Sequence, residues 1–432
     1  MEALGILVLL ISFFFFIGIG VPIAISIGIS GILTMLVSID SLPAFTTFAM
    51  RMASGLDSFA LLAIPFFVLA GNIMNRGGIA VRLINFARGL VGSSPGGLAF
   101  VNVVANMLFS SISGSAAASA SAIGSIMTPE MRKAGYDPSY SAAVNITSAT
   151  TGLIIPPSNV LIVYSLASGG VSISALFMAG YIPGILMGFA VMIAAGIMAN
   201  RRKYPVGTAI PFTETMKRFW DALPSLLLLF IIIGGILAGL FTATEASAVA
   251  VVYALILAFI YKEISVKDIP GILLSSVKTT AIVLLLVATC TGLSWILSYE
   301  SIPQAVTASM LTVSENPFII LLLINLVLLV IGFFMDITPA VLIFTPIFLP
   351  IAVGQLGMDP VHFGIMMVMN LSIGLCTPPV GSLLFIGCSV ANVKIEQVIK
   401  PLLPMFAIMI AILLLTAYIP QISMFLPNLF GL

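Results

Sequence analysis

Apolar residues occur along this chain in long runs that short polar stretches interrupt. A helical membrane crossing needs about 20 predominantly apolar residues. On that criterion we predict ten crossings, five in each half of the chain. They cover residues 3–20, 22–38, 58–75, 138–168, 174–200, 222–241, 243–261, 279–299, 360–390 and 401–419. The pattern therefore predicts an all-α polytopic membrane protein.

Two further apolar stretches look like pairs of short helices around a polar tip. The first covers residues 97–133 with its tip at 111–115, and the second covers 317–355 with its tip at 336–339. A helix of fifteen residues rises only about 22 Å, which is less than the roughly 30 Å hydrocarbon core. We therefore predict that each stretch is a re-entrant hairpin, which enters and leaves the membrane on one side.

A pattern of glycines and prolines occurs twice, 222 residues apart. Gly135, Asp137, Pro138, Gly152, Pro156 and Pro157 recur as Gly357, Asp359, Pro360, Gly374, Pro378 and Pro379. Both copies break a predicted crossing, because proline lacks a backbone donor and restricts its predecessor. Paired broken helices are typical of the ion and substrate site of secondary transporters. We predict two repeats, 1–221 and 222–432, each with five crossings, a hairpin and a broken helix (138–168 and 360–390).

The composition and the charge pattern agree with this arrangement. The chain is 60% hydrophobic and 7% charged, whereas soluble domains carry about 25% charged residues. Five crossings per repeat is an odd number, so the two repeats are expected to be inverted. Of the 16 Lys and Arg residues, all except Arg51 then fall on one side, which is expected to be cytoplasmic. Both termini should face outward, with the first hairpin entering from the cytoplasm and the second from outside.

Four more segments have an amphipathic pattern and are too short or too polar to cross: residues 42–57, 79–90, 265–276 and 302–313. They occur at matching places, two in each half. We expect helices that lie in the membrane interface and brace the scaffold. Loops are the alternative.

The broken helices and the hairpin tips provide oxygen ligands. An unwound helix exposes carbonyl groups, which suit cations, and amide groups, which suit anions. The tips add the hydroxyls of Ser111, Ser113, Ser115 and Thr338, with Asp336 beside Thr338. Such oxygens suit a hard monovalent cation, whereas transition metals prefer sulfur and imidazole. We predict one cation site per repeat and no organic cofactor; the alternatives are that Ser and Gly only allow close helix packing and that neighbouring amides satisfy Asp336.

Enzyme classes fit the sequence poorly, so we expect no enzymatic activity. An intramembrane aspartyl protease needs two aspartates at membrane depth, and only Asp336 is expected there. An intramembrane serine protease needs a histidine within a span, and the sole histidine, His362, is expected at the outer face. No phosphate-binding loop occurs. An ion channel remains an alternative, because broken helices also build selectivity filters.

Three segments together resemble the DctM-like large membrane subunit of tripartite ATP-independent periplasmic (TRAP) transporters. They are Ile64 to Asn72, the tip Ser113 to Ser115 with Ala122 to Ile126 after it, and Thr377 to Gly381. The resemblance implies a sodium-driven importer of organic anions in the bacterial inner membrane. It also implies two partners, a small four-span membrane subunit and a periplasmic substrate-binding protein. The first tip is nearer the sialic-acid branch, and C4-dicarboxylates or other carboxylates are the alternatives.

The resemblance further implies an elevator mechanism. The hairpins and broken helices would form a transport core that moves against a scaffold of residues 1–90, 174–313 and 401–432. A stand-alone sodium-coupled carboxylate symporter with the same hairpins is the nearest alternative. Transport that survives without a binding protein would favour that alternative.

The family pattern also implies site residues. The first sodium ion would lie among Ser113, Ser115, Gly152, Ile155 and Pro157. The second would lie among Gly332, Asp336, Thr338, Gly374, Thr377 and Val380. The substrate would contact Ser158, Asn159, Gly381 and Ser382. No arginine is expected at substrate depth, so the carboxylate would depend on half-helix amides, hydroxyls and the bound cations.

The predicted outer face is acidic. It carries Glu2, Asp40, Asp57, Glu300, Glu315 and Asp359 against Arg51 alone. This charge could dock a binding protein, although avoidance of positive charge on the outer side explains it equally well. We expect the small subunit to pack on the scaffold spans, lipid to surround both, and no nucleic acid to bind.

Overall fold

The computed structural model describes residues 2–207, 210–378 and 381–432. These parts are helical, without strands apart from an isolated bridge between Pro95 and Val206. The helices are α1 (Glu2–Gly18), α2 (Ile23–Ser38), α3 (Ser41–Leu56), η1 (Phe59–Leu62), α4 (Ala63–Arg76), α5 (Ile79–Val91), α6 (Gly97–Ser113), α7 (Ala116–Lys133), α8 (Pro138–Thr151), α9 (Asn159–Ala167), α10 (Ile173–Arg201), α11 (Phe212–Leu237), α12 (Ala243–Ile260), η2 (Val266–Asp268), α13 (Ile269–Tyr299), α14 (Ile302–Val313), α15 (Pro317–Phe334), α16 (Ile337–Gly354), α17 (Pro360–Gly374), α18 (Ser382–Ala391), α19 (Ile395–Tyr418) and α20 (Gln421–Phe430).

The chain is a polytopic membrane protein. Within the described ranges, eight helical segments are long and apolar enough to cross a membrane. They include both helices of the second hairpin, α15 and α16, whereas α1 and α2, each predicted to cross, fall below that length. Helix length by itself therefore does not separate crossings from hairpin arms here.

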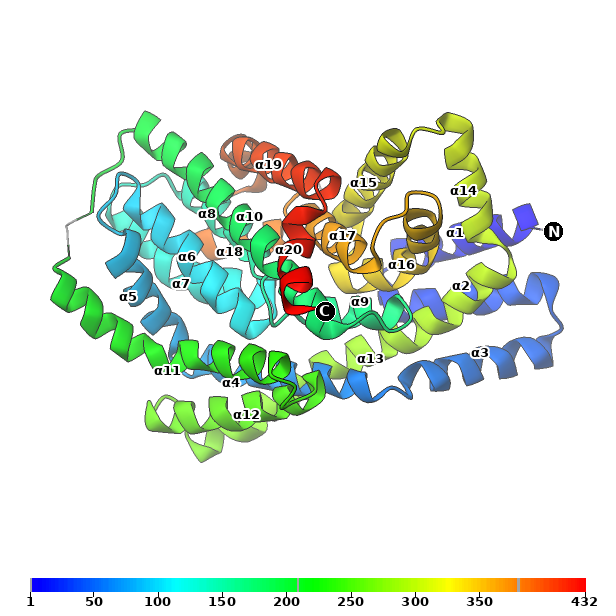
Figure 1. Cartoon of the computed structure of the whole chain (residues 1–432), viewed down its shortest axis with the longest axis horizontal. Helices are drawn as coiled ribbons and strands as arrows, with labels where there is room; N and C mark the ends of the chain where they lie inside the picture. The colour runs from blue at the N-terminus through cyan, green and yellow to red at the C-terminus, as the bar shows by residue number, and fades with distance from the viewer. Residues whose placement is uncertain (1, 208–209, 379–380) are drawn as a thin grey trace.

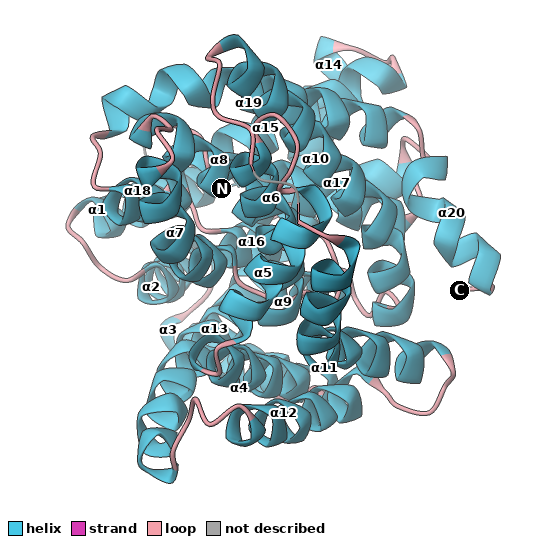
Figure 2. Ribbon diagram, turned by 90° about the vertical axis from the view of Figure 1, so that its left-hand side faces the viewer, coloured by secondary structure: helices cyan, strands magenta, loops and turns pink. Residues whose placement is uncertain are grey.

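Four helices form a layer along one side of the molecule. Helices α3, α4, α12 and α13 lie along the lower side in Figures 1 and 2. Helix α4 packs against α12 and α13, and α13 also packs against α2 and α3. All four lie within the residues 1–90 and 174–313 that were predicted to belong to the scaffold, and they contact each other across the two halves of the chain.

One predicted boundary in this layer is wrong. Residues 265–276 and 279–299 were expected to be separate, but Ile269–Tyr299 is one helix of 31 residues. Nothing between Ser276 and Ala281 interrupts it, because neither glycine nor proline occurs there. In the first half the separation is real, since α3 ends at Leu56 and Asp57 is not helical (ψ 63°).

The first hairpin has a tighter turn than predicted. Helix α6 continues to Ser113, and the turn is only Gly114 and Ser115. Ser111 remains helical and its hydroxyl donates to the Leu108 carbonyl at 2.9 Å. Gly114 ends α6 with a φ of +64°, a left-handed conformation that favours glycine. Ser115 then caps α7 by accepting a hydrogen bond from the Ala118 amide at 3.3 Å.

The turn of the second hairpin is also shorter than predicted. Helix α15 ends at Phe334, and Asp336 is the residue before α16. Thr338 and Pro339, which were expected in the turn, belong to the first turn of α16. Proline is tolerated there because amides of the first turn need no intrahelical acceptor.

Both predicted broken helices are interrupted where expected. Helix α8 stops at Thr151 and α9 begins at Asn159, and α17 stops at Gly374 while α18 begins at Ser382. Their first halves form the centre of the molecule, since every residue of α8 from Tyr140 and of α17 from His362 is buried. Many of these residues in α8 are Ser or Thr, and their hydroxyls bond to carbonyls three or four residues earlier in α8.

The two halves of the chain interlock. Helix α7 packs against α18, and α16 packs against α9, so each hairpin contacts the broken helix of the other half. Helix α10 also packs against α17, and α19 against α8. Helix α20, which the sequence analysis did not foresee, packs on α10 and α17.

His362 is buried beneath α20 instead of lying at an interface. It is 1% exposed, and its Nδ1 lies 2.7 Å from the Ser423 hydroxyl. Its other ring nitrogen lies 3.3 Å from the Ala417 carbonyl. The sequence did not predict α20, so nothing in it indicated that His362 would be covered.

Candidate functional site

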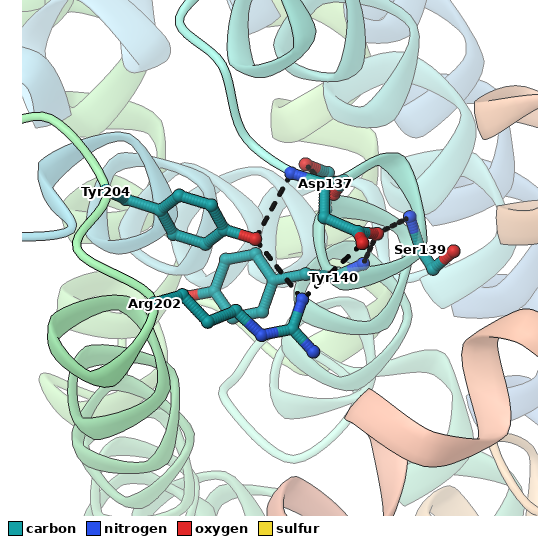
Figure 3. Close-up of polar contacts among 6 residues, drawn as sticks. Asp137, Ser139, Tyr140, Arg202 and Tyr204 are labelled. Atoms are coloured by element: carbon teal, nitrogen blue, oxygen red, sulfur yellow. Dashed lines mark hydrogen bonds and ion pairs between the residues drawn. The ribbon is translucent and has the colours of Figure 1, made fainter.

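A polar clasp fixes the start of the first broken helix. The Asp137 carboxylate accepts hydrogen bonds from the amides of Ser139 and Tyr140, at 2.7 and 3.1 Å, and so caps α8 (Figure 3). Arg202, at the end of α10, lies 3.6 Å from that carboxylate. Its guanidinium also donates to the Tyr204 hydroxyl at 3.2 Å, which in turn accepts from the Asp137 amide. The clasp therefore holds the α8 terminus on α10.

The second broken helix is capped in the same way but held by other residues. Asp359 accepts from the Val361 amide at 2.7 Å. The Tyr164 hydroxyl, from α9, donates to the Pro360 carbonyl at 2.6 Å. The second half of one broken helix thus supports the first half of the other.

Buried amides join each hairpin to its broken helix. Asn106 of α6 donates to the Ser148 hydroxyl and the Asn145 amide oxygen of α8, at 2.9 and 3.1 Å. It accepts from Ser119 of α7 at 2.7 Å. In the second half, Asn370 of α17 donates to the Asn325 side chain of α15 at 2.9 Å. Because unpaired amides are costly in apolar surroundings, these bonds fix the register between hairpin and helix.

The two hairpin turns and the two helix breaks surround one cavity of about 270 Å³. The turns contribute Ser113, Ser115 and Asp336, and the breaks contribute Leu153 and Leu375. Scaffold helices α4 and α13 close the remaining side. Of the lining residues, which all lie in the described ranges, Asp336 alone has an ionisable side chain.

Four helices begin at this cavity. The first residues of α7, α9, α16 and α18 all contribute to its lining: Ala116, Asn159, Ile337 and Ser382. A helix N-terminus carries unpaired amide donors and about half a positive charge. Because four helices begin at its lining, the cavity suits an anion even though no arginine lines it.

The structure brings only part of the predicted site together. Ser113, Ser115, Asn159, Asp336, Thr338 and Ser382 line the cavity. Gly152, Ile155, Pro157, Ser158, Gly332, Gly374, Thr377 and Gly381 lie outside its lining. Val380 lies outside the described residues.

Several of the remaining residues have packing roles. Gly152 contacts Ser110 of the first hairpin, and Gly332 contacts Gly374. Ile155 packs against Gly184 of α10. Ser158 immediately precedes α9 without a side-chain cap, and its hydroxyl donates to the Leu153 carbonyl at 2.5 Å. The breaks therefore combine residues that shape the unwound segment with residues that face the cavity.

Oxygen atoms of the kind that bind hard cations occur near the second break. A Cβ placed on Gly381 would lie 2.5 Å from the Leu375 carbonyl oxygen and 2.8 Å from that of Thr377. Both carbonyls therefore lie against Gly381, and they accept hydrogen bonds from the amides of Leu383 and Gly381, at 3.2 and 3.0 Å. Asp336 and Thr338 line the cavity beside Leu375. Carbonyl, carboxylate and hydroxyl oxygens are the ligands that hard cations prefer; clusters of three or more His, Cys, Asp or Glu are absent from the described ranges.

Scaffold residues on the cavity were missed by the sequence analysis. Asn72 of α4 and Thr279 of α13 line it, together with Ile64, Val68 and Val283. Asn72 also donates to the Ser276 hydroxyl at 2.8 Å. An asparagine in an apolar run was the available signal, since polar residues at membrane depth are usually functional.

The comparisons with known sequences all indicate the same family. The family described as "Tripartite ATP-independent periplasmic transporter, DctM component" matches residues 10–422. The chain is 56% identical to the uncharacterized protein YgiK of Salmonella typhimurium, over 99% of this chain and 98% of that one.

Two relatives with assigned roles also match over most of the chain. One is the C4-dicarboxylate TRAP transporter large permease protein DctM of Pseudomonas aeruginosa, 41% identical over 94% of each chain. The other is the sialic acid TRAP transporter large permease protein SiaM of Vibrio cholerae, 40% identical over 88% of this chain and 89% of that one. These relatives are permeases and not enzymes, which confirms that expectation.

Among solved structures, the YdaH transporter of Alcanivorax borkumensis has a similar fold. Its TM-score is 0.66 at 16% identity, and the match covers 92% of this chain and 90% of that one. The family match and the relatives, taken with the paired helix breaks around one cavity, confirm the resemblance found in the sequence. The chain therefore belongs to the DctM family, the large permease component of tripartite ATP-independent periplasmic transporters.

Proposed function

We propose that this protein carries organic acid anions inward across the bacterial inner membrane, coupled to sodium, as the large permease of a tripartite transporter. The observation that supports the proposal most directly is the convergence of four helix N-termini on one cavity. Their amides suit a carboxylate. A sugar acid or dicarboxylate has several oxygens to accept the remaining donors, including Asn159 and Ser382.

The sodium coupling rests on the donor set and on energetics. Asp336, Thr338 and Leu375 line the cavity at one hairpin tip, and Ser113 and Ser115 line it at the other. Moving a monoanion inward against 100 mV costs about 2.3 kcal/mol. Two sodium ions moving down that potential and a tenfold gradient supply about 7 kcal/mol. We propose two sodium sites, one at each tip.

The inverted arrangement of the repeats is part of the proposal. The two turns line one cavity, while in Figure 1 the α6–α7 pair lies to the left of the centre and α15–α16 to the right. The hairpins thus reach the cavity from opposite directions. This supports two inverted repeats, 1–221 and 222–432, with re-entrant hairpins and outward-facing termini.

The elevator mechanism is supported by how the core meets the scaffold. The hairpins and broken helices interlock with each other, whereas α4 and α13 close only one side of the cavity. Gly71 of α4 touches the hairpin tip, since a Cβ there would lie 2.7 Å from the Ser113 carbonyl oxygen. A contact of this kind favours sliding, because glycine places no side chain between α4 and Ser113. We propose that the core moves as a unit along α4 and α13.

The substrate class is an organic acid. The dicarboxylate and sialic acid relatives are 41% and 40% identical, so similarity does not favour sialic acid over a C4-dicarboxylate. The partners we propose are a small membrane subunit on the exposed scaffold helices and a periplasmic binding protein.

The test is uptake into proteoliposomes that contain the chain with its small subunit and binding protein. Labelled succinate, sialic acid and 2,3-diketo-L-gulonate are offered in turn, with an inward sodium gradient or a potassium gradient of equal size. We expect saturable uptake of one acid that needs both sodium and the binding protein. Uptake that persists without the binding protein would favour a stand-alone symporter, and unsaturable current would favour a channel.

A further inference from the structure

One line of side chains on α4 runs from the cavity to a cation. Ile64, Val68 and Asn72 line the cavity at intervals of four residues, which places them on one face of the helix. Arg76 is the next member of this series and the last residue of α4. It lies about 6 Å farther along the axis than Asn72.

The opposite wall of this path is α13. Val283 and Thr279 line the cavity there, and Ser276, one turn farther on, accepts the hydrogen bond from Asn72 at 2.8 Å. A Cβ on Gly271 would lie 3.7 Å from Arg76 Nη1. The guanidinium therefore lies over the seam between α4 and α13, directly beyond the Asn72–Ser276 bond.

The charge of Arg76 is available to a ligand. The side chain is exposed, and it forms no ion pair within 4.0 Å among the described residues. Asp268, whose carboxylate feels the charge of Arg76, is itself bound to the amide and hydroxyl of Ser265, at 2.8 and 2.7 Å. Other arginines in this region are engaged, as with Arg88 and Glu130 or Arg218 and Glu214.

We propose that Arg76, with Asn72 and Thr279, forms an exit site for the organic anion between the cavity and the cytoplasm. The polarity of the path rises from aliphatic side chains, through an amide and a hydroxyl, to a full positive charge. A carboxylate that leaves the helix N-termini then has a second attractive position within one helical turn. The Arg76 end is cytoplasmic in the topology that the Lys and Arg distribution indicates. This inference rests on the proposed function.

The site lies on α4 and α13, which belong to the scaffold that stays fixed in the proposed elevator mechanism. Arg76 therefore acts on the anion only when the core has brought the cavity beside Asn72 and Thr279. Loss of Arg76 should weaken binding from the cytoplasmic side and leave binding from the outer side unchanged. This side-specific effect distinguishes an exit site from a general effect on folding or on sodium binding.

The experiment uses proteoliposomes that contain the complete transporter and measures how acid inside the vesicles inhibits uptake from outside. The acid used is the one that the wild type takes up among succinate, sialic acid and 2,3-diketo-L-gulonate. The internal concentration of that acid which halves initial uptake is determined for wild type, Arg76→Gln, Arg76→Lys and Arg201→Gln. Arg201 is an exposed arginine at the end of α10 and serves as the matched control.

We expect Arg76→Gln to raise the half-inhibiting internal concentration at least fivefold, and Arg76→Lys and Arg201→Gln to stay within twofold of wild type. The external half-saturating concentrations of acid and sodium should not change. An equal shift in Arg201→Gln, no shift in Arg76→Gln, or an equal shift on the external side would overturn the exit site while leaving the proposed function intact. A wild type that transports none of the acids would overturn the proposed function, and the exit site with it.

Discussion

Gly374 of the second broken helix packs directly against Gly332 of its hairpin, so that a Cβ on Gly374 would lie 2.5 Å from the Gly332 Cα. The positions 222 residues earlier are Gly152 and Ser110, which also touch. A Cβ on Gly152 would lie 2.8 Å from the Ser110 Cα. Each break therefore lies beside a close contact between a broken helix and its own hairpin, and the absence of a side chain on the glycine permits that contact.

Gly374→Ala is expected to destabilise the protein, because its methyl group would overlap the backbone of Gly332. Overpacking of this kind typically costs about 1–3 kcal/mol. Thermal unfolding of the purified protein should show a lower midpoint. Gly354→Ala is the control, since nothing lies within 4 Å of a Cβ at that helix end, and it should unfold as wild type does. Equal midpoints for the two variants would contradict the contact.

Asp336→Asn should weaken sodium coupling. The carboxylate is the one ionisable group on the lining of the cavity, and an amide offers a cation a neutral oxygen in place of a charged one. The sodium concentration for half-maximal uptake should rise about tenfold or more, with little change in protein yield. Glu315→Gln, at an exposed acidic position before α15, should leave the sodium dependence unchanged. An unaltered sodium dependence in Asp336→Asn would argue against a cation site at this tip.

Asn159→Ala should weaken substrate binding selectively. The side chain lines the cavity at the start of α9, and loss of one hydrogen bond to a charged ligand costs about 1.5–3 kcal/mol. The half-saturating concentration of the acid should rise roughly tenfold or more, while the sodium dependence is retained. If both dependences shift together, Asn159 acts on the shape of the break and not on the substrate.

Asn106→Ala should destabilise the first hairpin. The substitution removes the partner of the Ser119 hydroxyl and the donor to the Asn145 amide oxygen, and each unpaired buried group costs about 1–3 kcal/mol. The unfolding midpoint should fall clearly. Ser125→Ala is the control on the same hairpin, because Ser125 is exposed and its hydroxyl bonds only to the carbonyl of Ala122, one turn earlier. A comparable loss in the control would show that α7 is sensitive to any change.

The acidic outer face can now be tested residue by residue. Glu300 is 7% exposed, and its carboxylate accepts from the Ser38 hydroxyl at 2.7 Å, so it is not available for docking. Glu315 is exposed. If charge attracts the binding protein, Glu315→Gln should slow its association at low salt, whereas Glu300→Gln should not. Unchanged association rates in both variants would leave avoidance of outer positive charge as the explanation.

The sequence by itself determined the membrane character, the positions of both helix breaks and the family. These features are largely local, because a glycine followed closely by two adjacent prolines removes two backbone donors from one turn, whereas single prolines such as Pro183 and Pro224 lie inside continuous helices. A long apolar run likewise needs lipid or a buried environment. The continuity of residues 269–299 as one helix was missed for a related reason. The polar residues around Lys278 suggested that a helix ends there, but neither glycine nor proline lies there to end it.

Only the tertiary structure decided which of the site residues share a space. Asn72 and Thr279 reach the cavity because α4 and α13 cross beside the hairpin tips, and Glu300 and His362 are buried because α2 and α20 cover them. Gly152 and Gly374, which the family pattern places at the ions, also pack closely against Ser110 and Gly332 of the hairpins. Burial and side-chain direction depend on neighbours distant in the chain, and the pattern of one segment carries no information about them.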